Sequence, residues 1–166
     1  FTDTGLESWR RDPLLYTNIA SDCVYDLIKR DYAPLENRLR SAIARMRALP
    51  SLLDQARLNL DGPSRIKTEI AIGQTAGAVD LFRTVINMAA EGSAASGEVR
   101  QASEIAASAM ESYLDWLKSD LLPRAKEEWR LGPALYDRAF QLAGGTTREP
   151  LEVLGRAEAD FETTRE

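Results

Sequence analysis

Histidine is absent from this sequence of 166 residues, and its absence excludes several kinds of active site. Without it the chain can form neither a Ser-His-Asp nor a Cys-His nucleophile system, and neither an HExxH zinc site nor a Glu-x-x-His di-iron site. Cysteine occurs once, at Cys23, so no disulfide can form within the chain. We therefore expect no catalytic residue, no cofactor-binding residue and no metal ligand in this chain.

The sequence also lacks the features of membrane-spanning and nucleic-acid-binding proteins. No uninterrupted apolar segment approaches the roughly 20 residues that span a bilayer. The N-terminal segment FTDTGLESWRRD has no basic stretch followed by an apolar one, as a signal peptide would. The net charge of -5 disfavours binding to nucleic acid. We expect no transmembrane segment and no nucleic-acid partner, and the sequence leaves open a cytoplasmic or an exported location, a lipoprotein included.

What the sequence does contain is typical of a helical globular protein. Hydrophobic residues make up 44% and charged residues 28% of the chain, which are ordinary values. Apolar residues recur at three- and four-residue steps, and no segment alternates as a strand would. The sequence predicts an all-α fold, an irregular bundle of about seven helices, in a single domain over residues 1–166.

The clearest helical pattern runs from Asp31 to Leu60. An earlier helix, which precedes this stretch in the chain, is expected to begin at Asp12-Pro13, because a capping aspartate and a first-turn proline favour helix initiation. Pro50 is expected to divide the stretch into two helices, since proline breaks a helix interior. The apolar face of the first helix consists of Leu35, Leu39, Ala42, Ile43, Met46 and Leu49, and that of the second consists of Leu52, Leu53, Ala56 and Leu60.

Two long helices, over about 65–90 and 97–122, are expected to form a central antiparallel pair around the linker EGSAASG. Ser64 or Asp61 is the expected cap of the first helix, and Ser96 is that of the second. The first helix carries two apolar stripes, which is typical of a central helix. Small residues on one stripe have small counterparts on the second helix, and we expect the two faces to pack closely: Gly73, Ala76 and Gly77 against Ala102, Ala106 and Ala109.

The C-terminal part is expected to contain a short segment over 127–131 that could be extended, followed by two further helices. Gly132-Pro133 begins the first of these helices, and Gly144-Gly145 ends it. Thr147 is the expected cap of the last helix, with Pro150 in its first turn.

One short pattern matches a catalytic motif. Ser64-Arg65-Ile66-Lys67 fits the S-x-x-K serine–lysine pair of penicillin-binding proteins. The accompanying S-D-N and K-T-G elements are missing, because Ser119-Asp120 is followed by leucine and Lys67-Thr68 by glutamate. The favoured interpretation is a helix-capping serine beside a surface lysine.

The remaining candidates also have simpler structural interpretations. Arg38, Arg40, Arg45 and Arg47 flank the apolar face of their helix; a membrane-surface or partner-helix role is the alternative. Three carboxylate pairs are expected on solvated faces. Three tryptophans and Cys23 are expected in or near the core. The Gly73-x-x-x-Gly77 pattern is expected to serve helix packing in a soluble protein. The pairs are Asp22 with Asp26, Glu111 with Asp115 and Glu127 with Glu128; the tryptophans are Trp9, Trp116 and Trp129.

Four segments in order give the sequence a family resemblance. They are RDPLLYTN at 11–18, RDYAPLENRLRSAIARMRALPSLLDQARLNL at 30–60, KTEIAIGQTAGAVDLF at 67–82 and WLKSDLLPRAKEEWRLGPALYDRAF at 116–140. Each segment alone is a helix pattern, but the ordered set resembles the bacterial domain-of-unknown-function 885 family, DUF885, over nearly the whole chain.

The resemblance implies a longer protein with a fold similar to the thermostable-carboxypeptidase and neurolysin-like zinc peptidases. It implies an HExxH-type zinc site well downstream, so no ligand can be assigned to this chain. The first residue, Phe1, is not methionine, and the last helix pattern has no stop signal, which agrees with a piece of a longer protein. The implied role is that of an amino-terminal helical lobe that helps wall a substrate groove, with the rest of the polypeptide and peptides as partners. The alternative is a free-standing helical interaction or scaffold module.

Overall fold

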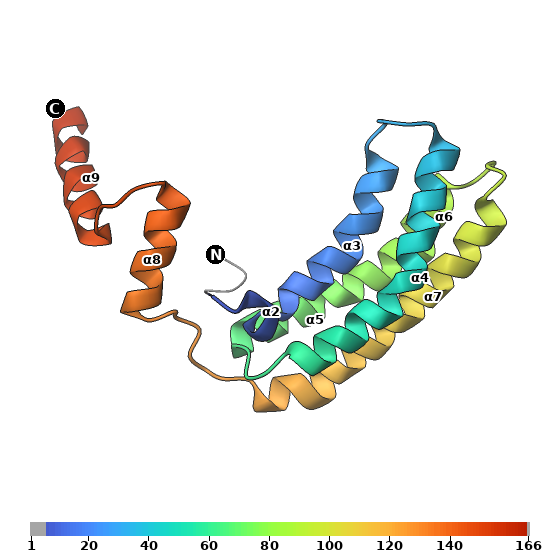
Figure 1. The fold of residues 1–166 in the computed structure, drawn as a ribbon, viewed down its shortest axis with the longest axis horizontal. Coiled ribbons are helices and arrows are strands. Elements are labelled where there is room, and N and C mark those ends of the chain that lie inside the picture. The colour runs from blue at the N-terminus through green and yellow to red at the C-terminus, as the bar shows by residue number, and fades with distance from the viewer. Residues whose placement is uncertain (1–5, 166) are drawn as a thin grey trace. The chain divides into compact units, whose positions relative to one another are not determined.

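The computed structural model describes residues 6–165, which are almost entirely helical and contain no strand (Figure 1). The predicted all-α fold is confirmed. The helices are α2 (Ser8–Arg11), α3 (Pro13–Lys29), α4 (Leu35–Asn59), α5 (Arg65–Asp80), α6 (Ile86–Ala89), α7 (Ser96–Trp116), α8 (Pro133–Gly144) and α9 (Pro150–Arg165). Short π-helical turns at Leu81–Val85 and Leu117–Leu121 and a 3₁₀ turn at Leu122–Arg124 continue α5 and α7.

The chain divides into two compact units. The larger unit is Glu7–Trp129, and the smaller unit contains residues 130–165 of the described chain. The expectation of a single domain over 1–166 stays a prediction.

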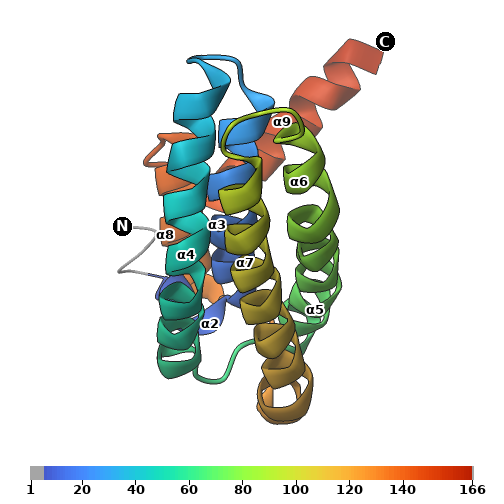
Figure 2. The same cartoon turned by 90° about the vertical axis from the view of Figure 1, so that its right-hand side faces the viewer.

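Four long helices build the larger unit. Helix α3 packs on α4 and α5, and α7 packs on the same two helices, so α3 and α7 lie diagonally across the bundle (Figure 2). Helices α3 and α5 run in one direction, and α4 and α7 run in the other (Figures 1 and 2). The core lies between these four helices, and its largest fully buried apolar side chains are Tyr113, Phe82, Leu39, Met46, Leu53, Ile86, Met110, Leu117 and Leu121.

The prediction that Pro50 ends a helix is wrong, because α4 continues through it to Asn59. An interior proline removes one backbone hydrogen bond. The apolar face nevertheless keeps its register across Pro50: Met46 and Leu49 before it and Leu53 and Ala56 after it are all buried. Burial of one continuous face on α3 and α7 therefore outweighs the local cost of the proline.

The antiparallel pair of long helices is confirmed, since α5 and α6 pack along α7. The expected packing of small faces is wrong for the first helix. Gly73, Ala76 and Gly77 are exposed, and α5 instead buries Ala71, Thr75 and Ala78. On α7, Ala102 and Ala106 are buried and Ala109 is half-buried.

The expected side-chain caps are confirmed at two of four helix starts, Asp12 and Ser64. The Asp12 carboxylate accepts a hydrogen bond from the Leu14 amide at 3.1 Å, and the Ser64 hydroxyl accepts one from the Lys67 amide at 3.4 Å. Ser96 is instead the first residue of α7, which has no side-chain cap. Thr147 lies outside the last helix, because α9 begins at Pro150 and Glu149 directly precedes it.

The smaller unit consists of α8 and α9, which contact each other. As predicted, α8 follows Gly132 and ends at Gly144-Gly145, where Gly145 adopts a left-handed conformation with φ of 57°. The segment before it, residues 127–131, forms neither a helix nor a strand. None of residues 130–165 is buried, although both helices carry apolar side chains.

Candidate functional site

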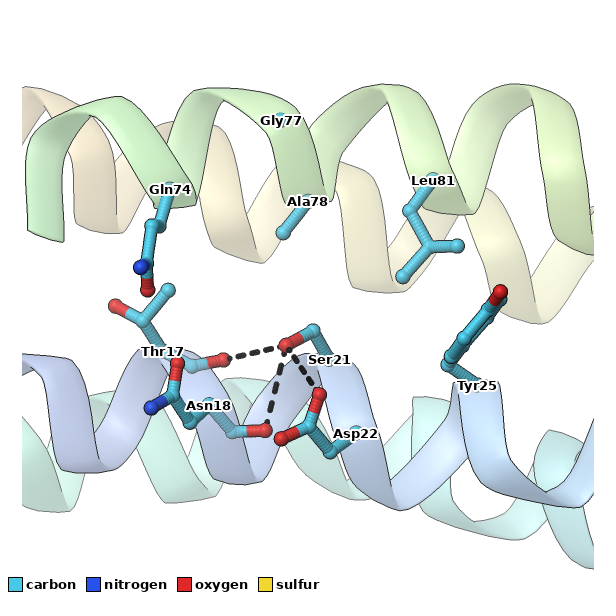
Figure 3. A pocket seen from close by; sticks show the side chains of 9 residues that line it. All are labelled: Thr17, Asn18, Ser21, Asp22, Tyr25, Gln74, Gly77, Ala78 and Leu81. Carbon is cyan, nitrogen blue, oxygen red and sulfur yellow. Dashed lines mark hydrogen bonds between the residues drawn. The ribbon is translucent and has the colours of Figure 1, made fainter.

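A shallow groove of about 390 Å³ runs between α3 and α5 (Figure 3). The face of α3 along this groove is polar, because Asn18, Ser21, Asp22 and Tyr25 follow each other at steps of three, one and three residues. The face of α5 is formed by Gln74, Gly77, Ala78 and Leu81. The groove therefore pairs a hydrogen-bonding wall with a largely apolar one.

A buried pair of hydroxyl groups fixes the distance between the two walls. The side chains of Thr17 and Thr75 share a hydrogen bond of 3.0 Å, and both residues are buried. Removing one of two hydroxyl groups that are hydrogen-bonded away from water is costly, because the remaining hydroxyl then lacks a partner. This contact holds α3 against α5 beneath the groove.

The polar side chains along the groove differ in whether they already form hydrogen bonds or ion pairs within the protein. The Ser21 hydroxyl donates to the backbone carbonyl of Thr17 at 3.0 Å, so it serves α3 itself. Asp22 forms no ion pair among the described residues. The amide of Gln74 extends from α5 toward α3 (Figure 3). The amides of Asn18 and Gln74 remain available to bind a ligand, and so does the Asp22 carboxylate, which accepts only a long hydrogen bond of 3.5 Å from the Ser21 hydroxyl.

The structure does not support the Ser64–Lys67 pair as a catalytic motif. The Ser64 hydroxyl caps α5, and the Lys67 ammonium group lies 2.5 Å from a carboxylate oxygen of Asp12. The lysine thus pairs with an acid at the start of α3 and does not act on the serine. The interpretation as a helix cap is confirmed.

The arginine cluster of α4 mainly joins α4 to α3. Arg38 is buried, and its guanidinium group donates to the backbone carbonyls of Leu27, Ile28 and Ala33 at 3.2, 2.9 and 2.8 Å. It also donates to the exposed carboxylate of Asp31 at 3.0 Å. Arg38 therefore satisfies the last carbonyl groups of α3, which have no partner within that helix.

The other three arginines of the cluster are exposed. Arg45 donates to the backbone carbonyl of Cys23, and Arg47 lies 3.5 Å from Glu98 of α7. Only Arg40 has neither a hydrogen bond nor an ion pair with a described residue. The prediction that these arginines border a buried face agrees with the structure, and a membrane-surface role gains no support from it.

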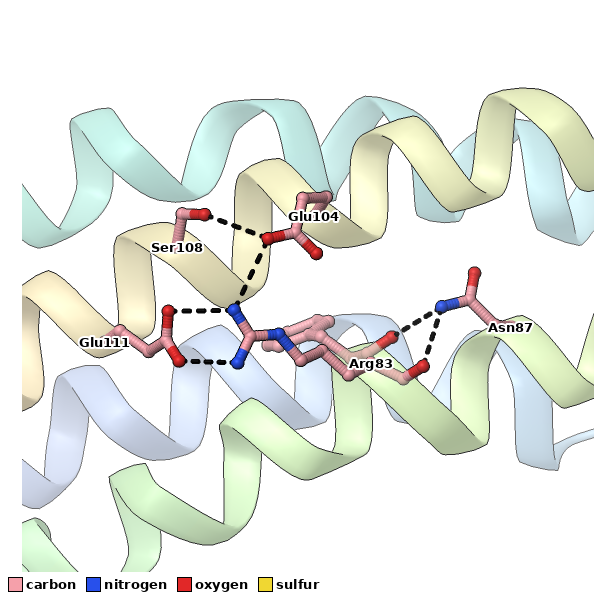
Figure 4. A network of polar contacts seen from close by, with 6 residues as sticks. Arg83, Asn87, Glu104, Ser108 and Glu111 are labelled. Atoms are coloured by element: carbon pink, nitrogen blue, oxygen red, sulfur yellow. Dashed lines mark hydrogen bonds and ion pairs between the residues drawn. The ribbon is translucent and has the colours of Figure 1, made fainter.

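The carboxylate pairs belong to exposed ion pairs or to the surface, as expected. The most developed example is a network on α7, in which Arg83 lies 2.5 Å from Glu111 and 3.4 Å from Glu104 (Figure 4). The guanidinium group of Arg83 donates hydrogen bonds to Glu111 and Glu104, and these bonds raise its pKa above the ordinary value. Asp26 pairs with Arg30 in the same way, one helical turn apart.

The expectation that the tryptophans lie in or near the core is confirmed for Trp116 and wrong for Trp9 and Trp129. Trp116 stacks on Tyr113 with ring centroids 5.7 Å apart, while Trp9 and Trp129 are exposed. Cys23 is half-buried, and burial raises the pKa of its thiol. None of these side chains lines the groove between α3 and α5.

Tyr113 lies on the same side of α7 as Ala102, Ala106 and Ala109, but the sequence gives no sign of its unusual hydroxyl group. The side chain is fully buried, and its hydroxyl has no hydrogen-bond partner among the described residues. Burial raises the pKa of Tyr113 far above its ordinary value, because the charged form would lose its hydration. Periodicity predicts that such a residue is buried, but it carries no information about which atoms meet the hydroxyl.

The described residues contain no group of three or more side chains that could hold a metal ion. They also contain no helix that is both long and apolar enough to cross a membrane. A resident zinc ion would therefore find no fitting ligand set in the described part of this chain. The expectation that the chain contributes no catalytic or cofactor-binding residue stays a prediction.

Comparison with known proteins gives a family and one structural relative. Residues 4–166 match the family described as "Bacterial protein of unknown function (DUF885)". No protein with a curated description matches the chain. A solved structure described as "a putative lipoprotein of unknown function from Shewanella oneidensis" is similar, with a TM-score of 0.82 and 27% sequence identity. The similarity covers 98% of this chain and 31% of that one, so this chain spans about a third of the length of its relative. The chain belongs to the DUF885 family of bacterial proteins.

Proposed function

We propose that this chain is a non-catalytic helical lobe of a longer DUF885 protein, and that the longer protein is a zinc-dependent peptidase whose metal site lies outside these residues. The observation that carries the first part is the coverage of the Shewanella oneidensis relative, of which 31% corresponds to this chain. The peptidase assignment is supported by the family resemblance of the sequence.

The smaller unit supports the role as part of a larger assembly. Helix α9 buries none of its residues, and Leu151, Leu154 and Phe161 lie on one side of it at steps of three and seven residues. Leu151 is 79% exposed and Phe161 is 63% exposed. Because burial of such side chains is the main source of helix stability in proteins, we infer that this face packs on further protein in the functional state.

The groove between α3 and α5 supplies a surface that such a lobe could contribute to substrate binding. Asn18 and Gln74 each carry one amide donor and one amide acceptor, which suits hydrogen bonding to a peptide backbone. Asp22 adds one negative charge that no described cation neutralises. In this proposal the lobe binds and orients a peptide, and residues elsewhere in the polypeptide break it.

Metal analysis combined with a peptide-hydrolysis screen tests the proposal. The longer protein should contain zinc and cleave peptides, and a chelator should abolish cleavage. The 166-residue chain should show neither zinc nor cleavage in the same assays. A longer protein that is free of metal and inactive would contradict the peptidase assignment, and a reading frame that ends near Glu166 would contradict the lobe.

A second candidate is a helical module that binds another protein. The same exposed face of α9 favours it, because an exposed apolar face of this kind also marks protein–protein interaction sites. The two candidates differ in what stabilises α8 and α9. In the lobe it is the rest of the same polypeptide, so the longer protein should protect the backbone amides of residues 133–165 from hydrogen exchange without any added partner.

A further inference from the structure

The outward side of α5 and α6 carries a row of apolar side chains that the larger unit leaves half-exposed. Ile66, Ile70 and Met88 are 51%, 46% and 63% exposed. Ile66 and Ile70 lie about one turn apart on α5, and Met88 follows on α6, beyond the π-helical turn at Leu81–Val85. In Figure 2 the two helices form an outer edge of the larger unit. We call this row, together with the glycines described next, the α5 face.

Two glycines belong to the α5 face, Gly73 and Gly77, and Gly77 lies where this face borders the groove between α3 and α5. Gly73 and Gly77 are exposed, and a Cβ atom added at either would meet nothing within 4 Å. Glycine weakens a helix relative to alanine, so these positions carry a cost. No neighbour within the described chain requires the missing side chains. A second helix lying directly over them would require them, because small residues allow two helix backbones to approach closely.

The charges beside the α5 face indicate the chemistry of such a partner. Asp80 is the last residue of α5, and it forms no ion pair with a described residue. The basic residues nearest to it in sequence are already neutralised, Arg65 by Glu69 and Arg83 by Glu111. A covering segment would therefore be apolar along its centre and would carry lysine or arginine at its edges.

The length of the structural relative indicates where this segment comes from. That chain is matched over 31% of its length at a TM-score of 0.82, so most of it lies beyond the region that corresponds to this chain. We propose that the α5 face is the docking surface for an apolar helix with basic edges from the part of the same polypeptide outside these 166 residues. The inference rests on the proposed role as a lobe of a longer protein, but not on the peptidase activity.

Substituting the glycines tests the proposal, because the melting temperature should change in opposite directions in the 166-residue chain and in the longer protein. In the 166-residue chain, Gly73→Leu or Gly77→Leu should leave the melting temperature unchanged or raise it by up to about 4 °C, because leucine is the better helix former and meets open space. In the longer protein the same substitutions should lower the melting temperature by several degrees, because the new side chain displaces the docked helix.

Gly97→Leu is the matched control. Gly97 is also an exposed helical glycine with nothing within 4 Å of an added Cβ, but it lies in the first turn of α7, away from the α5 face. It should leave the longer protein as stable as the parent. A fall in stability for Gly97→Leu equal to that for Gly73→Leu would overturn the proposal, since the effect would not be specific to the α5 face.

Two other outcomes would also overturn it. If Gly73→Leu is neutral in the longer protein, no helix covers the glycines. If it already destabilises the 166-residue chain, the covering segment belongs to this chain and not to the remainder. Because the readout is stability, a longer protein without zinc or hydrolysis that still loses stability would refute the peptidase assignment and leave this inference intact.

Discussion

The larger and smaller units have similar helical sequence patterns but very different packing. Phe82 in the larger unit is completely buried, whereas Phe161 of α9 is 63% exposed. Both lie in apolar stripes at helical spacing. The comparison shows that an amphipathic pattern identifies the side of a helix that will be buried, but it does not say whether the partner lies within the same stretch of chain.

The difference matters for stability. Complete burial of a large apolar side chain contributes about 1.5–3 kcal/mol. The larger unit collects such contributions from four helices, and its core needs nothing from residues 130–165. In the smaller unit few apolar side chains contribute in this way, so its helices depend on contacts that they make in the functional state. The following predictions test this contrast, from the largest expected effect to the smallest.

Removing one buried ring should have the largest effect. Phe82→Ala should lower the free energy of unfolding of the chain by about 3–5 kcal/mol, because it removes apolar contacts and leaves a cavity. Phe161→Ala, the matched change in α9, should alter it by less than about 0.5 kcal/mol. Urea denaturation followed by circular dichroism measures both. If Phe82→Ala prevents folding, Phe82→Leu should show a smaller loss, and equal losses at Phe82 and Phe161 would contradict the contrast.

Removing the buried guanidinium group of Arg38 should have the second-largest effect on stability. Arg38→Met should lower the free energy of unfolding by about 2–3 kcal/mol, because carbonyl groups at the end of α3 lose their donors. Asp31→Asn removes the exposed partner of the same arginine and should cost less than about 1 kcal/mol. Equal costs for the two variants would mean that the ion pair, and not the capping of α3, is the stabilising interaction.

Removing the unpartnered hydroxyl should stabilise the chain. Tyr113→Phe should raise the free energy of unfolding by about 1 kcal/mol, because a buried hydroxyl without a hydrogen bond is costly. The matched change in the smaller unit is Tyr136→Phe, which alters a half-exposed hydroxyl and should be close to neutral. Thermal and urea unfolding at neutral pH measure both variants. A loss of stability in Tyr113→Phe would show that the hydroxyl has a partner, such as a buried water.

The same residue predicts how stability changes at high pH. The pKa of Tyr113 is raised in the folded state, so the unfolded chain releases this proton first, near its ordinary pKa of about 10. Above that pH the folded state binds more protons than the unfolded state, and the free energy of unfolding falls as pH rises. The fall should be smaller in Tyr113→Phe than in the parent chain. Urea titrations between neutral pH and about pH 11 provide the comparison, and parallel curves would refute the assignment.

Disrupting surface ion pairs should have the smallest effect in either unit. Arg83→Gln breaks the network with Glu104 and Glu111, and Arg148→Gln breaks the pair with Glu152. All these groups are largely solvated, so we expect no resolvable change in stability at physiological salt. Thermal unfolding at low and physiological salt tests this. A clear loss for Arg83→Gln at both salt concentrations would show that the network of Figure 4 is structural.

Several helices could be predicted because their local signals agree with their packing. Asp12 and Ser64 cap helices, and Gly145 ends one, since each of these residues acts on the backbone next to it. Pro50 was misjudged for the opposite reason. Its local effect is to break a helix, but buried residues on both sides of it keep one face in register. That continuity is visible in the sequence and was the better signal.

The candidate groove was harder to predict. Asn18, Ser21 and Asp22 lie on one face of α3, which periodicity can show. Their proximity to Gln74 depends on the packing of α3 beside α5, helices that are separated in sequence by the whole of α4. Gly73 and Gly77 were wrongly assigned to the contact with α7, because a sequence pattern shows that a helix has a small side without showing which neighbour it faces.

The all-α class, most helix positions and the lack of histidine side chains can be read from the sequence, because they depend on local spacing and on composition. Which apolar faces are buried depends on how the helices pack. This packing placed the Thr17–Thr75 contact under a groove, left the Tyr113 hydroxyl without a partner and turned Gly73 and Gly77 outward. The physical reason is that burial depends on neighbours far apart in the chain, and a helical pattern presents the same apolar face to whichever neighbour the fold supplies.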